Sequence, residues 1–137
     1  MAEIEINIPA TRRGLTTALA RIEDFAAARN LCADQIARVR VVAEELVTNT
    51  IKYGYGAECD RPIRLVVREG PALIMIYEDQ APLFDPTVRR PREGPAAVRR
   101  KVRVGGAGVD LVLALSSSVA HEGGPEWNRL TLTFAPR

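Results

Sequence analysis

One predicted helix carries a carboxylate, an amide and an amine on the same side. Glu45, Asn49 and Lys52 are separated by four and three residues, so their side chains are neighbours over successive helical turns. A carboxylate and an amide oxygen placed in this way can face a common ligand. A solvated polar face would explain Glu45 and Lys52 equally well. Asn49 favours the functional interpretation, because asparagine is a mediocre mid-helix residue that competes for backbone hydrogen bonds.

Two further stretches have groups suited to a ligand. Asp79 ends an alternating segment and is followed by a proline-containing turn. Aspartate at a strand end is often only a turn former, but it can also accept a hydrogen bond from an amine such as N6 of adenine. Residues 105–108, Gly-Gly-Ala-Gly, precede a helical segment, and such a run lets backbone N–H groups approach phosphates. It is not a Walker A motif, because Lys and Ser/Thr do not follow the last glycine.

The elements that position these residues follow from the apolar periodicity. An apolar face formed by Ile36, Val39, Ala43 and Leu46 predicts that the helix carrying Glu45 rests on a core. In the first part of the chain we predict a strand over 3–8 closed by Pro9, a helix over 12–30 capped by Thr11, and the central helix from a cap at Asp34 to a stop at Gly54 and Gly56. A hairpin of strands over 63–69 and 72–79 follows, and then a long loop over 80–106. The chain ends with a helix through Leu115 and strands over 119–122 and 128–134. This order predicts an α+β two-layer sandwich, with helices on one face of a mixed, mostly antiparallel sheet.

Length and composition indicate a globular chain. We expect residues 1–137 to form a single domain, because this length suffices for one full core. No apolar run approaches the 18 or so residues of a membrane span, and the N-terminus lacks the features of a signal peptide, so we expect a cytoplasmic location. Cys32 and Cys59 have no metal-ligand spacing, and the chain has a single histidine, so we expect no zinc site. We expect both thiols to be buried and reduced.

Basic charge is concentrated in one part of the predicted loop. Seven Lys and Arg residues lie between positions 87 and 104 against Glu93 alone, whereas the net charge of the whole chain is +2. A nucleic-acid interface is one interpretation, but the cluster has no interleaved aromatic residues. We therefore predict that residues of about 87–104 form a lid over a phosphate-bearing ligand, and we expect no direct nucleic-acid partner and no membrane.

Taken together and in this order, the three stretches resemble the motifs of the GHKL (Bergerat-fold) ATP-binding superfamily, which includes gyrase, the Hsp90 chaperone, histidine kinases and MutL. Residues 45–54 resemble its N box, residues 79–86 its first glycine box and residues 105–113 its second. Within the superfamily, the compact length and the sequence Phe84-Asp85-Pro86 resemble the anti-sigma factor serine/threonine-protein kinases.

This resemblance implies a role for each candidate residue. Glu45 would be the catalytic general base, Asn49 would hold Mg²⁺ against the triphosphate of ATP, and Asp79 would recognise adenine. The remaining residues implied to surround the nucleotide are Tyr53, Ala81, Gly105, Gly106, Gly108 and Val109. Ala81 stands where the first glycine box usually has glycine, and Tyr53 stands where relatives commonly have histidine.

The resemblance also implies partners. The chain would sequester a sigma factor as a homodimer and phosphorylate a serine or threonine of a STAS-domain anti-anti-sigma protein, so that the two partners exchange. The alternative is an ATP-binding partner-switch module that transfers no phosphate. Glu45 favours the kinase, because a module that only binds ATP needs no base at that position.

Overall fold

A computed structural model describes residues 2–82, 107–124 and 126–137. The elements in chain order are β1 (Glu3–Ala10), α1 (Arg12–Arg29), α2 (Ala33–Asn49), the π-helical turn η1 (Thr50–Gly54), β2 (Cys59–Arg68), β3 (Leu73–Asp79), α4 (Ala107–Leu115), β4 (Ser118–Gly123) and β5 (Asn128–Phe134). None of the helices in these ranges is long and apolar enough to cross a membrane.

The described strands form one five-stranded sheet in the order β1-β2-β3-β5-β4, and every neighbouring pair is antiparallel. β2 and β3 form the predicted hairpin, in which Ile63 lies opposite Asp79. On its other side β3 pairs with β5, so that Asp79 lies opposite Asn128. This register places Asp79 and Asn128 on the same face of the sheet, because directly paired residues share a face.

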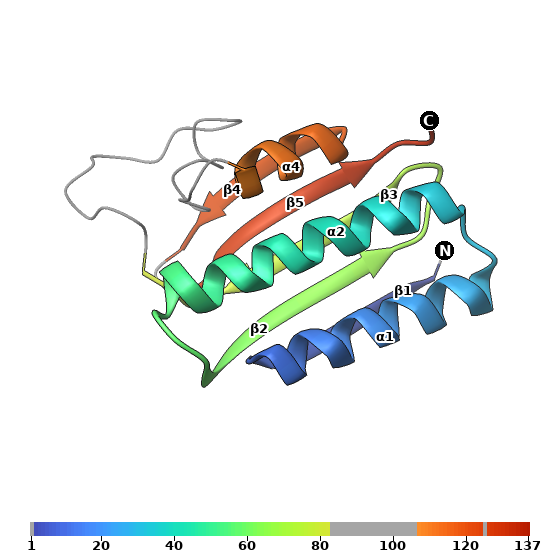
Figure 1. Cartoon of the computed structure of the whole chain (residues 1–137). Coiled ribbons are helices and arrows are strands. Elements are labelled where there is room, and N and C mark those ends of the chain that lie inside the picture. Colours follow the sequence, from blue (N-terminus) through green and yellow to red (C-terminus); the bar gives the residue numbers. More distant parts are fainter. Residues whose placement is uncertain (1, 83–106, 125) are drawn as a thin grey trace.

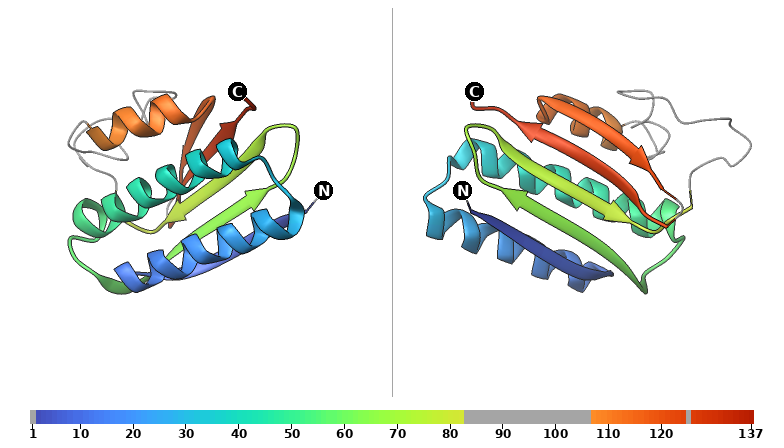
Figure 2. Two further views of the ribbon diagram at one scale, coloured as in Figure 1. Left: turned by 45° about the vertical axis from the view of Figure 1, so that its right-hand side comes forward. Right: turned by 180° about the vertical axis from the view of Figure 1, so that it is seen from behind.

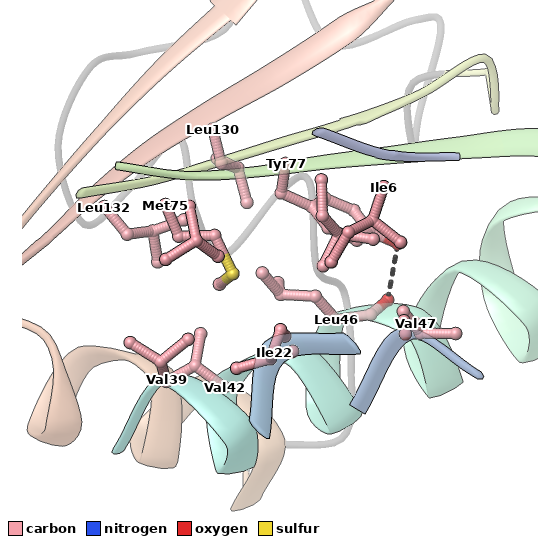
Figure 3. Close-up of a cluster of buried hydrophobic side chains, with 14 of the residues drawn as sticks. Ile6, Ile22, Val39, Val42, Leu46, Val47, Met75, Tyr77, Leu130 and Leu132 are labelled. Carbon is pink, nitrogen blue, oxygen red and sulfur yellow. Dashed lines mark hydrogen bonds between the residues drawn. The ribbon is translucent and has the colours of Figure 1, made fainter. Parts of the chain in front are cut away.

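Helices α1, α2 and α4 all cover one face of the sheet, and the views from two sides show the other face without a helix (Figures 1 and 2). The predicted α+β two-layer architecture is therefore confirmed. Its core lies between the two layers (Figure 3). The fully buried side chains of this core include Ile6, Ile22, Val39, Leu46, Leu65, Met75, Tyr77, Leu130, Leu132 and Phe134.

The ends of α1 follow from local sequence. Thr11 caps the helix as predicted, because its Oγ1 accepts a hydrogen bond from the Gly14 N–H at 2.9 Å. The helix ends at Asn30, whose φ of 53° is the left-handed conformation in which asparagine commonly terminates a helix. The prediction that Pro9 closes β1 is wrong, since the strand continues to Ala10. β1 lies at the edge of the sheet, where a proline is tolerated.

The start of α2 differs from the prediction. Cys32, and not Asp34, occupies the N-cap position, and its side chain makes no capping hydrogen bond. Asp34 lies in the first turn, where a negative charge interacts favourably with the helix dipole, and it pairs with Arg38 at 3.0 Å. The expectation that both thiols are buried is wrong for Cys32, which is exposed, and Cys59 is only partly buried.

The face of the sheet that carries no helix in the described residues is lined with cross-strand ion pairs. Arg64 contacts Glu5 at 3.0 Å and also pairs with Glu78, which in turn accepts a hydrogen bond from Arg129 at 2.6 Å. The Arg64 guanidinium, followed by the neighbouring Asn7 amide, lowers the pKa of the Glu5 carboxyl. This chain of alternating charges joins β1, β2, β3 and β5 and fixes their register.

Candidate functional site

Glu45 and Asn49 lie on the face of α2 that is turned toward α4. The orientation of this face is set by Arg38, whose Nη1 donates a hydrogen bond to the carbonyl of Leu115 at 3.2 Å, at the end of α4. At 3.6 residues per turn, positions seven and eleven residues after Arg38 lie within about 20° of it around the helix axis. Glu45 and Asn49 occupy those positions, and both are half-buried.

The N-terminus of α4 lies at the same end of the molecule as Asn49. Helices α2 and α4 run antiparallel, with the end of α4 beside the first half of α2 (Figure 1). Ala107 lies eight residues before Leu115, about 12 Å along the helix, and Glu45 lies seven residues after Arg38, about 10.5 Å along α2. The first turn of α4, with its partial positive charge, therefore lies beside the turn of α2 that carries Glu45 and Asn49.

A network of hydroxyl groups connects the end of α2 to β3. Thr50, the first residue after α2, donates a hydrogen bond from Oγ1 to Oδ2 of Asp79 at 2.8 Å. The Tyr77 hydroxyl lies 2.5 Å from Thr50 Oγ1 and 3.1 Å from the carbonyl oxygen of Leu46 (Figure 3). Residues 46 and 50 thus face the sheet, and Glu45 and Asn49, each one residue earlier, are rotated by about 100° away from it.

Asp79 is fully buried and is held as a hydrogen-bond acceptor. In addition to Thr50, the Asn128 amide donates to Asp79 Oδ1 at 3.0 Å and the Ala81 backbone N–H donates to the same oxygen at 3.3 Å. The Asn128 amide also donates to the Ala81 carbonyl at 2.5 Å. Asn128 therefore bridges the carboxylate and the turn that follows it.

Two tyrosines beside Asp79 have raised pKa values. Burial, and then the nearby charge of Asp79, raise the pKa of the Tyr77 hydroxyl well above its ordinary value. Burial also raises the pKa of Tyr55, whose hydroxyl accepts a hydrogen bond from the Gln80 N–H at 2.9 Å. Both hydroxyls are therefore protonated at neutral pH and act as hydrogen-bond donors as well as acceptors.

A family model described as the histidine kinase-like ATPase domain matches residues 8–134. The chain belongs to this family. Comparison with curated proteins gives no match. Among solved structures, the crystal structure of the RsbU and RsbW domains of Rv1364c from Mycobacterium tuberculosis has a TM-score of 0.67 and 17% sequence identity, and the similar region covers 98% of this chain. The same region covers only 32% of that longer chain, and a likeness at this identity is one of fold.

Membership of the histidine kinase-like ATPase domain family agrees with the resemblance drawn from the three sequence motifs. The structure brings Glu45, Asn49 and Asp79 to one end of the domain, through Thr50. Ala81 is buried beside Asp79, and Tyr53 is 52% exposed on η1. Gly108 and Val109 lie in the first turn of α4. Gly105, Gly106 and the predicted lid of about 87–104 lie outside the described residues.

Two polar residues of the site, Thr50 and Asn128, were not predicted from the sequence. Thr50 falls on the apolar face of the α2 periodicity, and it is buried against Asp79. Asn128 precedes Leu130 and Leu132 at the inward-facing positions of β5 and is also buried. A polar side chain in an inward-facing series was the available signal, because a buried polar group needs a hydrogen-bond partner.

Proposed function

We propose that this domain binds ATP with Mg²⁺ and acts as a protein serine/threonine kinase toward a STAS-domain anti-anti-sigma protein. The observation that carries the proposal is the convergence at one end of the domain of Glu45 and Asn49 on α2, the buried acceptor Asp79, and the N-terminus of α4. Membership of the histidine kinase-like ATPase domain family supports ATP as the ligand.

The residues present suit this ligand. The Asp79 carboxylate accepts hydrogen bonds from the Asn128 amide, the Ala81 N–H and the Thr50 hydroxyl. It is therefore held as an acceptor to which an exocyclic amine could donate. Because the Asp79 side chain is fully buried, contact with a base requires a local rearrangement. Among the described residues no group of three or more His, Cys, Asp or Glu side chains forms a metal cluster. A single amide oxygen from Asn49 fits Mg²⁺, which prefers few protein ligands together with phosphate oxygens and water.

Glu45 is the residue of this set suited to proton transfer. Bound ATP with its Mg²⁺ would supply the phosphoryl group and part of the charge neutralisation that phosphoryl transfer requires. Glu45 would accept the proton of the attacking serine hydroxyl, and the backbone N–H groups at the start of α4 would face the phosphate oxygens. The half-buried position of Glu45, on the same helix face as Asn49, supports this division of roles.

The proposal includes the partners of the anti-sigma branch. The STAS-domain protein would be the substrate, and a sigma factor would be released from a homodimer of this domain when the unphosphorylated substrate binds. The fold similarity to a structure that contains an RsbW domain is consistent with this branch.

The first test of the proposal is nucleotide binding. Calorimetric titration of the wild type with ATP should give an affinity that falls when Mg²⁺ is removed, and Asn49→Ala should lose this Mg²⁺-dependent part. Glu44→Ala is the matched control, because Glu44 is an exposed neighbour on the same helix and lies on a different face. An Asn49→Ala variant that keeps the full Mg²⁺ dependence of the wild type would exclude Asn49 as the residue that holds the metal.

A further inference from the structure

The π-helical turn after Asn49 and its C-cap residue Tyr55 contact three consecutive residues, namely Asp79 at the end of β3 and the two residues that follow it. Thr50 bonds the Asp79 carboxylate at 2.8 Å, and Tyr55, which donates its N–H to the Thr50 carbonyl at 2.7 Å to close the turn, accepts a hydrogen bond from the Gln80 N–H. Gly54 packs against Ala81. The wide turn thus directly follows the helix that carries Asn49, and together with Tyr55 it contacts Asp79, Gln80 and Ala81. π-Helical turns of this kind are frequent at functional sites.

Gly54 has no room for a side chain because of Ala81. A Cβ built on Gly54 would lie 2.8 Å from the Cβ of Ala81, closer than carbon atoms approach one another in proteins. The next contacts of that Cβ would be the Thr50 side chain at 3.5 Å and beyond, which is ordinary packing. Neither Gly54 nor Ala81 has a positive φ, so the requirement for glycine at position 54 comes from the methyl group at position 81.

The backbone between Asp79 and Ala81 is held on both sides. The Tyr55 hydroxyl accepts from the Gln80 N–H at 2.9 Å and donates to the Pro62 carbonyl at 2.8 Å. Arg61 donates to the Gln80 carbonyl at 2.9 Å, and its guanidinium lies over the Tyr55 ring, 4.6 Å from the centroid. With both polar groups of Gln80 engaged, the chain cannot adjust freely to a clash at Ala81.

We propose that Gly54 and Ala81 are a size-matched pair of positioning residues, which sets the distance between the end of α2 and the strand end at Asp79. Asn49 and Asp79 are then fixed relative to one another, so the base and the triphosphate of one nucleotide can be bound together. This inference rests on the proposed function. It assigns to Ala81 a structural partner on η1, and it identifies Gly54 as a residue on which base recognition depends.

The pair makes a prediction that neither residue makes alone. Moving a Cβ from 2.8 Å to an ordinary separation of about 3.5–4.0 Å displaces the strand end by roughly 1 Å, enough to break a hydrogen bond to Asp79. Gly54→Ala should therefore weaken ATP binding, and the exchange of the two residues in Gly54→Ala/Ala81→Gly should restore it, because the methyl group at position 54 then occupies the space left at position 81.

The test compares ATP with inosine triphosphate, which has a carbonyl oxygen in place of the adenine amine and so cannot donate a hydrogen bond to Asp79 from that position. Calorimetry with Mg²⁺ should show that the wild type prefers ATP. Gly54→Ala should lose roughly 10- to 100-fold in affinity for ATP but little of its affinity for inosine triphosphate. The double variant should regain the preference for ATP. Gly123→Ala is the matched control, because its Cβ would meet nothing closer than the His121 ring at 3.8 Å.

Each outcome decides between the explanations. A wild type that binds no ATP would contradict the proposed function and this inference with it. A wild type that prefers ATP, with Gly54→Ala keeping the same preference, would overturn the inference alone. Equal losses for both nucleotides would also overturn it, because they indicate general damage to the fold. If Gly54→Ala does not fold, the double variant decides: recovery of folding and preference supports the pair, and failure to fold contradicts it.

Discussion

The substitution Thr50→Val tests the connection between α2 and the strand end directly. Thr50 and Tyr77 have one hydroxyl proton each, and three contacts are made by these groups: Thr50 with Asp79, Thr50 with Tyr77, and Tyr77 with the Leu46 carbonyl. When Asp79 is ionised, the Thr50 proton is donated to its carboxylate, and the single Tyr77 proton is shared between Thr50 Oγ1 and the Leu46 carbonyl. Valine keeps the shape of threonine and removes both interactions.

The size of the effect follows from what each partner retains. Tyr77 keeps the Leu46 carbonyl as a partner, and Asp79 keeps the Asn128 amide and the Ala81 N–H, so neither group is left without a hydrogen bond. The main loss is one buried hydrogen bond to a charged group, for which we expect the free energy of unfolding to fall by about 1.5–3 kcal/mol. Threonine and valine have similar helix propensities, so the backbone contributes little.

Urea unfolding of the wild type, Thr50→Val and Thr48→Val measures this loss. Thr48 is the matched control, because it is a half-buried threonine at the end of the same helix. Thr48→Val should change the free energy of unfolding by less than about 0.5 kcal/mol. A Thr50→Val variant as stable as the wild type would refute the hydroxyl network, and so would equal losses in both variants.

Three further predictions concern the same fold and site. Arg38→Met should lower the free energy of unfolding by about 2–4 kcal/mol, because the buried guanidinium donates hydrogen bonds to two backbone carbonyls. The control Arg40→Met removes an exposed ion pair and should lower the free energy of unfolding, measured in urea, by less than about 1 kcal/mol. Folding raises the pKa of Tyr77 above its ordinary value of 10.0, so its contribution to the free energy of unfolding is fully present below about pH 10 and is lost as the pH rises further. In Tyr77→Phe the free energy of unfolding should therefore fall less steeply above pH 10. Asp79→Asn should weaken ATP binding by about 1.5–3 kcal/mol in calorimetry.

Each of these predictions has a contradicting result. Equal costs for Arg38→Met and Arg40→Met would mean that the buried contacts of Arg38 add nothing. A stability profile above pH 10 that is unchanged in Tyr77→Phe would show that this tyrosine titrates alike in the folded and unfolded protein. Equal ATP affinity for the wild type and Asp79→Asn would exclude Asp79 as the adenine acceptor.

Periodicity and turn residues were sufficient to predict the order of the described elements. The alternation over 128–134 predicted β5 with its observed bounds, and Thr11 predicted the start of α1. These signals are local, because each depends on which side of a strand or helix a residue faces or on which backbone groups need a cap. Asp34 shows their limit: an acidic residue near a helix start can lie in the first turn as well as at the cap.

The contacts across the site could not be predicted in the same way. Thr50 and Asp79 are 29 residues apart, Asn128 and Asp79 are 49 apart, and nothing in either local pattern specifies the pairing. The wide turn over Thr50–Gly54 was also missed, because Gly54 and Gly56 were interpreted as a simple helix stop. It is this turn that brings Gly54 against Ala81, so the consequence of alanine at position 81 becomes visible only in three dimensions.

Phosphoryl transfer by a Glu45 variant tests the proposed kinase most directly. Labelled ATP, Mg²⁺ and a STAS-domain protein are incubated with the wild type, Glu45→Ala and the control Glu44→Ala, and the transfer rate is measured beside ATP affinity. We predict that Glu45→Ala binds ATP like the wild type but transfers phosphate roughly 10²- to 10⁴-fold more slowly, because a general base acts only as the hydroxyl attacks. Full activity of Glu45→Ala would contradict its role as the base, and a wild type that binds ATP but phosphorylates no STAS-domain protein would contradict the kinase proposal and indicate a module that only binds the nucleotide.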